Sequence, residues 1–399
     1  MKEGWTYKKL GEVFPIVMGK TPPRNIARFW DKKKETGNRW VSIADLSKNE
    51  GKEIYDTKEY ISDEGKQNIK LVPKGSLLVS FKLTLGKMAF AGVDLYTNEA
   101  IMSLEKRKDI DLMFLFYYFS YLNWNKIASG NEKVKGKTLN KKSLSEIPVV
   151  YIPLSEQRSI VTRLDTALSR IDALKANAEK QLNEAKALFQ KALAEEMKPK
   201  ERWEEKTLGE ITVSMADGPF GSNLKKEHYT TNKEVRIIQL SNIGEEGWRE
   251  DNTKYTTFEH LKTIQRSEVK PGDVVIAKMM PAGRAILCPD NESKYVLSSD
   301  AVRATLKEGL DKRFVCFAIN SSSFRRQVYA NVSGSGRVRT SLTKLRDCKL
   351  YIPSPSDQQA IVAHLDSISS NIRKLEELQQ KTIAECDALK QAMLREVFE

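Results

Sequence analysis

The chain has 399 residues, of which 40% are hydrophobic and 30% are charged, and its formal net charge is +13 at pH 7. This composition is typical of a folded globular protein, and the length predicts two to three domains. The four cysteines are far apart and the three histidines stand alone. This pattern argues against a disulfide framework and a structural zinc site, and favours a reducing, cytoplasmic compartment.

The positive charge is concentrated in two long segments. Residues 1–150 carry 27 Lys and Arg against 18 Asp and Glu, and residues 201–350 carry 25 against 20. A basic excess of this kind indicates a polyanionic partner such as nucleic acid, although it also serves solubility. We therefore expect the two long segments to contact nucleic acid, and the shorter stretches after each of them to have another role.

Hydrophobic periodicity predicts mixed α/β domains with short strands, together with two much longer helices. In chain order the predicted elements are a strand over 76–81, a helix over 111–124, a long helix over 155–197, a strand over 274–277, a helix over 312–329 and a second long helix from 356 to the last residue. Pro199 ends the first long helix, and a capping pair of Ser356 and Gln359 begins the second.

The sequence is a unit of about 200 residues written twice. Three groups of residues recur in the same order in both halves. They are Trp5, Leu10 and Gly11, which recur as Trp203, Leu208 and Gly209; Tyr151, Ile152 and Pro153, which recur as Tyr351, Ile352 and Pro353; and Gln157, Leu164 and Asp165, which recur as Gln358, Leu365 and Asp366. We therefore expect two pseudo-symmetric domains, each followed by a long helix.

Both long helices carry a seven-residue apolar pattern, which favours packing of one helix on the other. The predicted seam is formed by Leu164, Ile171, Leu174 and Leu188 of the first helix and by Leu365, Ile368, Ile372, Leu375, Leu389 and Met393 of the second. Two similar domains that dock alike on a DNA duplex are related by a two-fold axis perpendicular to it, so we expect the helices to pair antiparallel. The alternative is that each helix packs on its own domain.

The candidate nucleic-acid contacts are cations and small polar residues near glycine-bearing loops. Arg and Lys can bind guanine edges and phosphates, and Asn can bind adenine edges. The candidates are Lys20, Thr21, Arg24, Lys82, Thr84, Lys87, Lys133, Lys135 and Lys137 in the first half, and Ser222, Asn223, Lys225, Lys278, Arg284, Arg337, Arg339 and Ser341 in the second. For each single residue a solvated surface position is the alternative, so the prediction rests on the clusters.

Motifs that suggest catalysis fail on spacing or context. The run 130–138 resembles a phosphate-binding P-loop, but five residues rather than four separate Gly130 from Gly136. Asp45 with Glu50 only loosely resembles the acidic cluster of a metal-dependent nuclease, and no methyltransferase tetrapeptide occurs. We therefore predict no catalytic residue, no bound cofactor and no metal site.

The tandem repeat, with its Trp5 and Trp203 openings and a long helix after each domain, resembles type I restriction-modification DNA specificity subunits over the whole chain. The run Gly-Lys-Thr-Pro-Pro-Arg at 19–24 and the run Asp-Gly-Pro-Phe-Gly-Ser at 217–222 are similar to two versions of an early recognition-domain motif of that family. The first half departs from the usual entry into its helix, reading Pro-Leu-Ser-Glu-Gln at 153–157, which changes the turn more than the role.

The resemblance implies an α+β protein that reads a bipartite, asymmetric site on double-stranded DNA and performs no chemistry itself. The implied parts are a first target-recognition domain over 1–153, a spacer helix over 154–198, a second target-recognition domain over 199–354 and a spacer helix over 355–399. The resemblance also implies that the two helices form an antiparallel coiled coil, which would set the spacing of the half-sites and dock two methyltransferase (M) subunits. It further implies that restriction/translocase (R) subunits join that core and that S-adenosylmethionine and ATP with Mg belong to the partners. No membrane contact is expected.

Two other classes of function remain open from the residues alone. A free-standing DNA nuclease or NTPase would turn over DNA or ATP as the purified chain, and changing one acidic residue or Lys137 would abolish that turnover. A coiled-coil adaptor without DNA contact would show no change in its affinity for duplex DNA when salt is removed.

Overall fold

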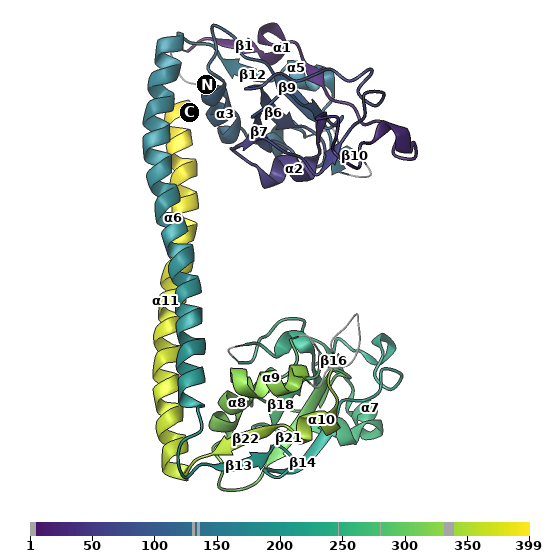
Figure 1. The fold of residues 1–399 in the computed structure, drawn as a ribbon, viewed down its shortest axis with the longest axis vertical. Helices are drawn as coiled ribbons and strands as arrows, with labels where there is room; N and C mark the ends of the chain where they lie inside the picture. Colours follow the sequence, from purple (N-terminus) through teal and green to yellow (C-terminus); the bar gives the residue numbers. More distant parts are fainter. Residues whose placement is uncertain (1–4, 130–131, 134–135, 246, 280, 331–338) are drawn as a thin grey trace. The chain divides into compact units, whose positions relative to one another are not determined.

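The computed structural model describes residues 5–129, 132–133, 136–245, 247–279, 281–330 and 339–399, and it divides into two compact units (Figure 1). Unit 1 comprises Met1–Ala178 with Lys381–Glu399, and unit 2 comprises Glu179–Gln380. Each unit therefore holds one globular domain and parts of two long helices, α6 (Leu154–Glu196) and α11 (Pro355–Phe398).

Unit 1 contains a five-stranded sheet in the order β2-β9-β6-β7-β4 and a three-stranded sheet in the order β5-β3-β8, with the smaller pairs β1-β12 and β10-β11. The strands are β1 (Tyr7–Lys9), β2 (Val17–Met18), β3 (Arg39–Val41), β4 (Glu53–Ile54), β5 (Glu59–Tyr60), β6 (Leu77–Ser80), β7 (Met88–Ala91), β8 (Tyr96–Thr97), β9 (Ile101–Leu104), β10 (Glu132–Lys133), β11 (Gly136–Lys137) and β12 (Pro148–Val150). The helices are α1 (Leu10–Val13), the 3-10 helix η1 (Ala27–Phe29), α2 (Ile43–Lys48), α3 (Leu112–Tyr121), α4 (Trp124–Ile127) and α5 (Lys141–Ser145).

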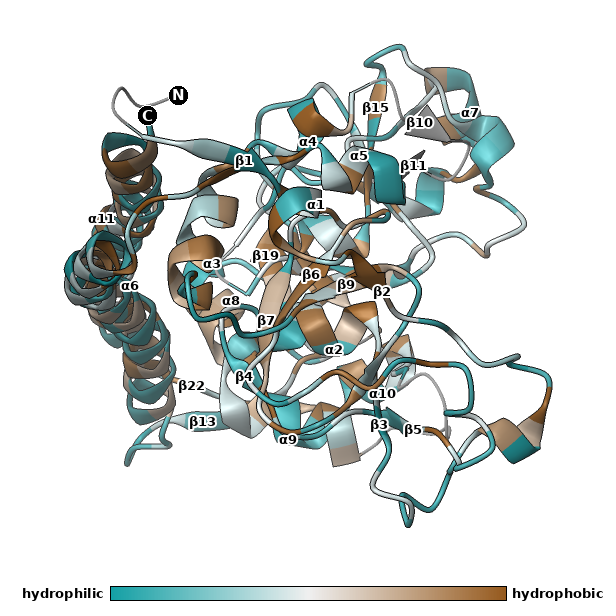
Figure 2. Ribbon diagram, turned by 90° about the horizontal axis from the view of Figure 1, so that it is seen from above, coloured by the Kyte–Doolittle hydropathy of each residue, from teal (hydrophilic) through white to brown (hydrophobic). Residues whose placement is uncertain are grey.

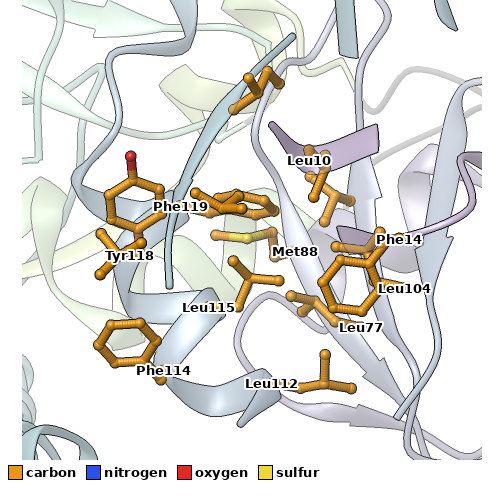
Figure 3. Packing of buried hydrophobic residues seen from close by; sticks show 14 of the residues in the cluster. Leu10, Phe14, Leu77, Met88, Leu104, Leu112, Phe114, Leu115, Tyr118 and Phe119 are labelled. Atoms are coloured by element: carbon orange, nitrogen blue, oxygen red, sulfur yellow. The ribbon is translucent and has the colours of Figure 1, made fainter. Parts of the chain in front are cut away.

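Strand β6 is buried on both of its faces, which explains why three apolar residues, Leu77, Leu78 and Val79, follow one another in it. Leu77 on one face packs near Leu115 of α3, which is 1% exposed (Figure 3). Leu78 points to the opposite face, in a cluster with Leu46 of α2. The five-stranded sheet is therefore the centre of the domain, with α3 on one face and α2 on the other.

Unit 2 repeats this plan with a four-stranded sheet in the order β14-β21-β18-β19, a second one in the order β16-β15-β20-β17, and the pair β13-β22. The strands are β13 (Glu204–Thr207), β14 (Thr212–Asp217), β15 (Val235–Ile238), β16 (Tyr255–Thr256), β17 (Glu268–Val269), β18 (Val274–Ala277), β19 (Ala285–Leu287), β20 (Tyr295–Leu297), β21 (Ala301–Leu306) and β22 (Lys349–Ile352). The helices are η2 (Lys226–His228), η3 (Leu240–Asn242), α7 (Phe258–Thr263), η4 (Gln265–Ser267), α8 (Lys312–Asn320), α9 (Ser322–Ala330) and α10 (Leu342–Arg346).

The predicted strand over 274–277 is confirmed as β18, whereas the predicted helix over 312–329 is two helices, α8 and α9. Ser321 separates them, because its backbone is extended (φ −66°, ψ 154°) and its hydroxyl donates to the carbonyl of Ala318 (2.6 Å). The same hydroxyl accepts the N–H of Phe324 in the first turn of α9 (3.4 Å). A serine that satisfies both helix ends in this way ends one helix and begins the next.

A buried glutamine ties each domain to the helix that follows it. The side-chain oxygen of Gln157 accepts the backbone N–H of Asp111 (2.9 Å), and that of Gln358 accepts the N–H of Asp311 (2.8 Å). Both glutamines are at most 1% exposed, and each also donates its amide to a backbone carbonyl at the end of its domain. Asp111 and Asp311 cap α3 and α8, so the repeated Gln is a joint between the core helix and the long helix.

The long helices run antiparallel in each unit, as predicted. In unit 1 Lys175 of α6 pairs with Asp387 of α11 (2.7 Å), and Asp172 pairs with Lys390. In unit 2 the contacting pairs are Gln181 with Gln379 (2.8 Å), Lys186 with Glu376 (3.7 Å) and Glu196 with His364 (2.8 Å). As the residue number rises along α6, that of its partner on α11 falls by nearly the same amount, which only antiparallel helices allow.

The packed seam of the helices differs in part from the predicted one. Leu164, Ile171, Leu365 and Ile372 are buried, and Ile368, Leu375 and Met393 are half-buried. Leu174, Leu188 and Leu389, in contrast, are 58%, 59% and 51% exposed, and they lie outside the buried seam. Helix α6 also packs on the globular domain of each unit, through Leu168 in unit 1 and Phe189 in unit 2. This second contact shifts the buried arc away from the three leucines. Figure 2 shows the resulting alternation of hydrophobic and hydrophilic residues along α6 and α11.

Within the described ranges, no helix combines the length and the apolar character needed to cross a membrane.

Candidate nucleic-acid interface

In unit 1 the loop after β2 is held against the loop before β9. The backbone N–H of Gly19 donates to the carbonyl of Ile101 (3.1 Å), and that of Lys20 donates to the carbonyl of Thr97 (2.8 Å). A Cβ atom at position 19 would lie 2.1 Å from the Thr97 carbonyl oxygen. Glycine is therefore required at position 19, because no side chain fits into this backbone contact.

Two further loops join the first pair. The N–H of Phe81 donates to the carbonyl of Ala100 (2.9 Å), and the N–H of Leu139 donates to the carbonyl of Phe81 (3.0 Å). Lys82 and Thr138 form an isolated antiparallel bridge. Four chain segments thus converge beyond the ends of β2, β6 and β9, and we call them loop site 1: residues 19–24, 81–87, 97–100 and 138–139.

Unit 2 repeats this arrangement in nearly the same hydrogen bonds. The N–H of Gly218 donates to Ala301 (3.0 Å), and a Cβ atom at position 218 would lie 1.7 Å from the Ser298 carbonyl oxygen. The N–H of Lys278 donates to the carbonyl of Asp300 (2.8 Å), as that of Phe81 does to Ala100. Lys278 is therefore the structural equivalent of a buried aromatic residue of unit 1.

The fourth segment of loop site 2 is held by a hydrogen bond and a bridge equivalent to those of residues 138–139 in unit 1. The N–H of Thr340 donates to the carbonyl of Lys278 (2.9 Å), and Met279 bridges Arg339. We call this group loop site 2: residues 217–225, 278–279, 281–284, 298–300 and 339–341. Most of the predicted contact residues lie in the two loop sites, although the sequence did not show that these segments meet.

Two cations of loop site 1, Arg24 and Lys87, have intramolecular carboxylate partners at the surface. Arg24 pairs with Glu59, and its guanidinium stacks over the ring of Trp30 with 4.1 Å to the centroid. Lys87 pairs with Glu50 (2.6 Å). Exposed ion pairs of this kind contribute less than about 1 kcal/mol, so an incoming phosphate can replace the carboxylate.

The remaining candidates of loop site 1 differ in exposure. Lys20 is exposed, Thr21 donates its hydroxyl to Glu99, and Lys82 and Thr84 are half-buried. The ammonium group of Lys82 lies 5.5 Å from the centroid of the Phe81 ring. Only Lys20 in this group presents a side chain that is largely open to solvent.

Loop site 2 exposes small polar residues and cations together. Ser222, Asn223 and Lys225 are exposed, and Arg339 pairs with Asp300 (3.5 Å) while remaining 52% exposed. The guanidinium of Arg284 is half-buried, and this burial lowers its pKa from the usual value.

Two candidates of loop site 2 have structural roles. The ammonium group of Lys278 pairs with Asp217 at 2.5 Å, and its side chain is 8% exposed. Ser341 is the N-cap of α10, where its hydroxyl accepts the N–H of Lys344 (3.2 Å). Both residues stabilise the site, and Lys278 is poorly placed to reach a bound ligand.

Sequence reasoning missed a pair of stacked histidines beside loop site 2. His228 and His260 were expected to stand alone, but their rings stack with centroids 4.1 Å apart. A ring nitrogen of His260 is 2.9 Å from the carbonyl oxygen of Asn223, and a ring nitrogen of His228 accepts the N–H of Lys225 (3.0 Å). Because two strands lie between these histidines in the chain, no local sequence pattern indicates that they are close in space.

For four of the predicted contacts the structure describes no side chain. Lys135 and Arg337 lie outside the described residues. For Lys133 and Lys137 the structure gives the backbone, which forms the short pair β10-β11.

The weak acidic motif has a structural explanation. The carboxylate of Asp45 caps α2 through the N–H of Ser42 (3.0 Å) and also accepts the N–H of Lys58 (3.0 Å). Glu50 pairs with Lys87, as described above. Among the side chains that the structure describes, no three His, Cys, Asp or Glu residues are placed to hold a metal ion.

The helix pair presents a second candidate surface. In unit 2 a groove of about 600 Å³ runs between α6 and α11, and exposed Leu188 and half-buried Leu375 lie along it. Their repeat equivalents in unit 1 are Leu389 and Leu174, which are both exposed. Lys175 pairs with Asp387, so the antiparallel register brings these two leucines close together as well. Each unit therefore carries an equivalent pair of leucines on its helices, of which both are exposed in unit 1 and Leu188 is exposed in unit 2.

Comparison with known proteins gives one consistent result. A family model described as the type I restriction modification DNA specificity domain matches residues 2–184 and again residues 200–384. The chain is 23% identical over 393 residues to the type I restriction enzyme MjaVIII specificity subunit of Methanocaldococcus jannaschii, covering 93% of this chain and 87% of that protein. It is 26% identical over 186 residues to the MjaIX specificity subunit of the same organism, a match that covers 44% of this chain and 40% of that longer protein.

Solved structures agree on the fold. A chain from a structure concerned with complex assembly and conformational transition of the type I R-M system matches with a TM-score of 0.76 and 18% identity. The match covers all of this chain and 98% of that one.

Proposed function

The chain belongs to the type I restriction modification DNA specificity family, and from this membership we propose that it reads a bipartite, asymmetric DNA site for a multisubunit enzyme. One recognition domain spans residues 1–153 and the other spans 199–354, and each reads one half of the site. The observation that carries this proposal is the loop site, which is built twice on the same backbone hydrogen bonds but lined by different side chains.

The DNA contacts are made by the exposed and half-buried members of the two loop sites. They are Lys20, Thr21, Arg24, Lys82, Thr84 and Lys87 of loop site 1, and Ser222, Asn223, Lys225, Arg284 and Arg339 of loop site 2. Lys and Arg neutralise phosphates and bind guanine edges, and Asn223 suits an adenine edge. Because the two sets of side chains differ, the two half-sites differ in sequence.

The subunit itself is non-catalytic, and chemistry belongs to its partners. Two methyltransferase (M) subunits bind the spacer helices over 154–198 and 355–399, and restriction/translocase (R) subunits join that core. S-adenosylmethionine and ATP with Mg are bound by those partners.

The exposed leucines support the docking of two identical partners. Leu188 and Leu389 occupy equivalent positions in the repeat and are 59% and 51% exposed. Exposed leucines at matched positions are an apolar surface that a partner helix can bury. Replacing both with Glu should abolish copurification of a methyltransferase subunit while leaving the thermal unfolding midpoint unchanged. Retention of that subunit would contradict the docking assignment.

The DNA-reading assignment is tested by matched arginine and lysine variants. Arg339→Ala removes an exposed, ion-paired cation from loop site 2, and Lys349→Ala removes an exposed, ion-paired cation from β22. We expect the first to weaken duplex binding by about 1–3 kcal/mol and the second to have no effect. Equal effects of the two variants would contradict the placement of the interface.

The whole function is tested by mapping modified bases in the genome of cells with and without this chain. We expect a bipartite, asymmetric methylation motif that disappears when the chain is deleted. A methylation pattern that does not depend on the chain would contradict the proposal.

A further inference from the structure

We infer that each recognition domain inserts one apolar side chain between base pairs of its half-site, Leu83 from loop site 1 and Phe220 from loop site 2. This inference rests on the proposed function and adds to it. The recognition domains deform the DNA as well as bind the edges of its bases. They therefore also discriminate sequences by the flexibility of base steps that no polar group contacts.

The two side chains are the most exposed large apolar residues in their loop sites. Phe220 is 83% exposed, which is the highest value for a large hydrophobic residue in the described part of the chain, and Leu83 is 65% exposed. Single exposed apolar residues are common on protein surfaces, so exposure alone carries no argument. These two residues differ from other exposed apolar residues in their position within the loop sites and in the rigid backbone that carries them.

Phe220 is presented by a loop that is fixed at both ends. Gly218 has no room for a side chain against Ser298, which locks the start of the loop. The N–H of Asn223 closes a turn on the carbonyl of Phe220 (2.8 Å), and Leu224 is buried directly after it. The stacked histidines then hold the end of the loop through the Asn223 carbonyl. The aromatic ring therefore projects from a rigid support.

Leu83 is held in a backbone conformation that leucine rarely adopts. Its φ is +61°, and the N–H of Thr84 donates to the carbonyl of Lys82 (2.7 Å), so Leu83 is the central residue of a tight three-residue turn. Left-handed backbone at a residue with a Cβ is unfavourable, and glycine would suit this turn better. A strained, exposed leucine at the tip of a hairpin in the binding loops indicates that the side chain itself has a use.

The chemistry of the two side chains fits a wedge. Proteins that kink DNA insert Phe, Leu, Ile, Met or Pro between base steps, while cations beside the wedge grip the phosphates. Lys82 and Lys87 flank Leu83 in the same hairpin, and Lys225 follows Phe220 in the same loop. The two wedges come from different loops of the repeat, so the two halves of the DNA would be deformed at different positions.

The test uses the full chain with the subunits that copurify with it. The probe is a duplex carrying the motif mapped from genomic methylation, with 2-aminopurine placed at one position at a time, because its fluorescence rises on unstacking. We expect a several-fold rise at one step in each half-site. Leu83→Ala should remove the rise in one half only, and Phe220→Ala should remove it in the other half only. Each variant should weaken binding by about tenfold without changing the salt dependence, because no phosphate contact is lost.

The controls are Leu71→Ala and Val213→Ala, which remove exposed apolar side chains outside the loop sites and should change nothing. Leu83→Gly should remove the fluorescence rise without lowering the thermal unfolding midpoint, because glycine relieves the turn. This separates loss of the wedge from loss of the fold.

The outcomes separate this inference from the function on which it rests. If the wild-type complex binds the duplex in a salt-dependent manner but fluorescence stays flat, or if neither variant alters it, the inference is overturned and the function stands. The same holds if either variant releases a copurifying subunit while fluorescence is unaffected, because the side chain then contacts protein. If the wild-type complex shows no salt-dependent binding of the mapped duplex, the proposed function itself fails.

Discussion

The two globular domains share a backbone framework, which we call the frame, and they differ in the side chains of their loop sites. The buried glutamines Gln157 and Gln358 make the same joint between core helix and long helix, and Gly19 and Gly218 make the same close backbone contact. The residues that recur in sequence are thus those that hold the frame. The loop sites keep the frame's backbone hydrogen bonds and change the side chains, as expected of two readers with different targets.

One position shows how far the two domains have diverged within the same frame. In unit 1 the buried ring of Phe81 lies in the apolar core, where Met18 packs against the same cluster. At the equivalent positions unit 2 has Lys278 and Asp217, which form an ion pair at 2.5 Å. A repeated backbone therefore accommodates either an apolar contact or a charged one, provided that both members change together.

The largest effect is expected from the equivalent leucines at the start of the long helices. Leu164 and Leu365 are at most 1% exposed in the cores of units 1 and 2. Replacing either with Ala should lower the free energy of unfolding of its own unit by about 2–5 kcal/mol, whereas Leu174→Ala should cost less than about 0.5 kcal/mol. Chemical denaturation, monitored by hydrogen exchange in each unit, measures the stability loss of each of these variants. Strongly unequal losses at Leu164 and Leu365 would show that the two leucines are not equivalent in their units.

A smaller effect is expected from the ion pair that replaces the apolar contact. Asp217→Asn leaves the buried ammonium group of Lys278 unpaired and should lower the free energy of unfolding by about 2–3 kcal/mol. This loss is no larger than the smallest losses expected for fully buried ion pairs, because Asp217 is 46% exposed. The double variant Asp217→Met with Lys278→Phe copies unit 1 and should recover most of this loss in thermal unfolding. A double variant that is less stable than Asp217→Asn would show that the frames are not interchangeable here.

The glutamine joint should give a further, smaller loss. Gln157→Leu and Gln358→Leu each leave the backbone N–H of an aspartate cap without its acceptor, in a buried setting. We expect each to lower stability by about 1–2 kcal/mol and to increase hydrogen exchange at α3 or α8 in the affected unit alone. Exchange that increases equally in both units would argue against independent joints.

The smallest expected effect is a pH dependence confined to unit 1. The Arg107 guanidinium, which donates two hydrogen bonds to Asp109, holds the pKa of that carboxyl well below its usual range. A lowered pKa stabilises the fold above the unfolded value of about 3.9, and this contribution is lost as the pH falls below it. Wild type should therefore exceed Asp109→Asn in stability at neutral pH, with the difference shrinking in acid. Unit 2 has Gly309 at this position and is the internal control; a difference that grows in acid would contradict the assignment.

The sequence predicted the repeat, the antiparallel helices and the strand β18, because these depend on residues that recur or alternate along the chain. It did not predict the break at Ser321, since a single serine between two apolar stretches carries no periodic signal. The exposure of Leu174 and Leu188 also escaped prediction, because one helix serves both its partner helix and a domain. The burial of Lys278 and the stacking of His228 on His260 depend on distant segments, and local patterns do not report those.

The central claim, that one frame carries two independent readers, is tested most directly by building a chain with two copies of the same reader. Residues 1–153 would replace residues 199–354, and methylated bases would be mapped in cells that carry only this chain as specificity subunit. We predict a symmetric motif in which the half-site read by the first domain appears twice as an inverted repeat. A motif that stays asymmetric, or that repeats the half-site in direct orientation, would contradict the account.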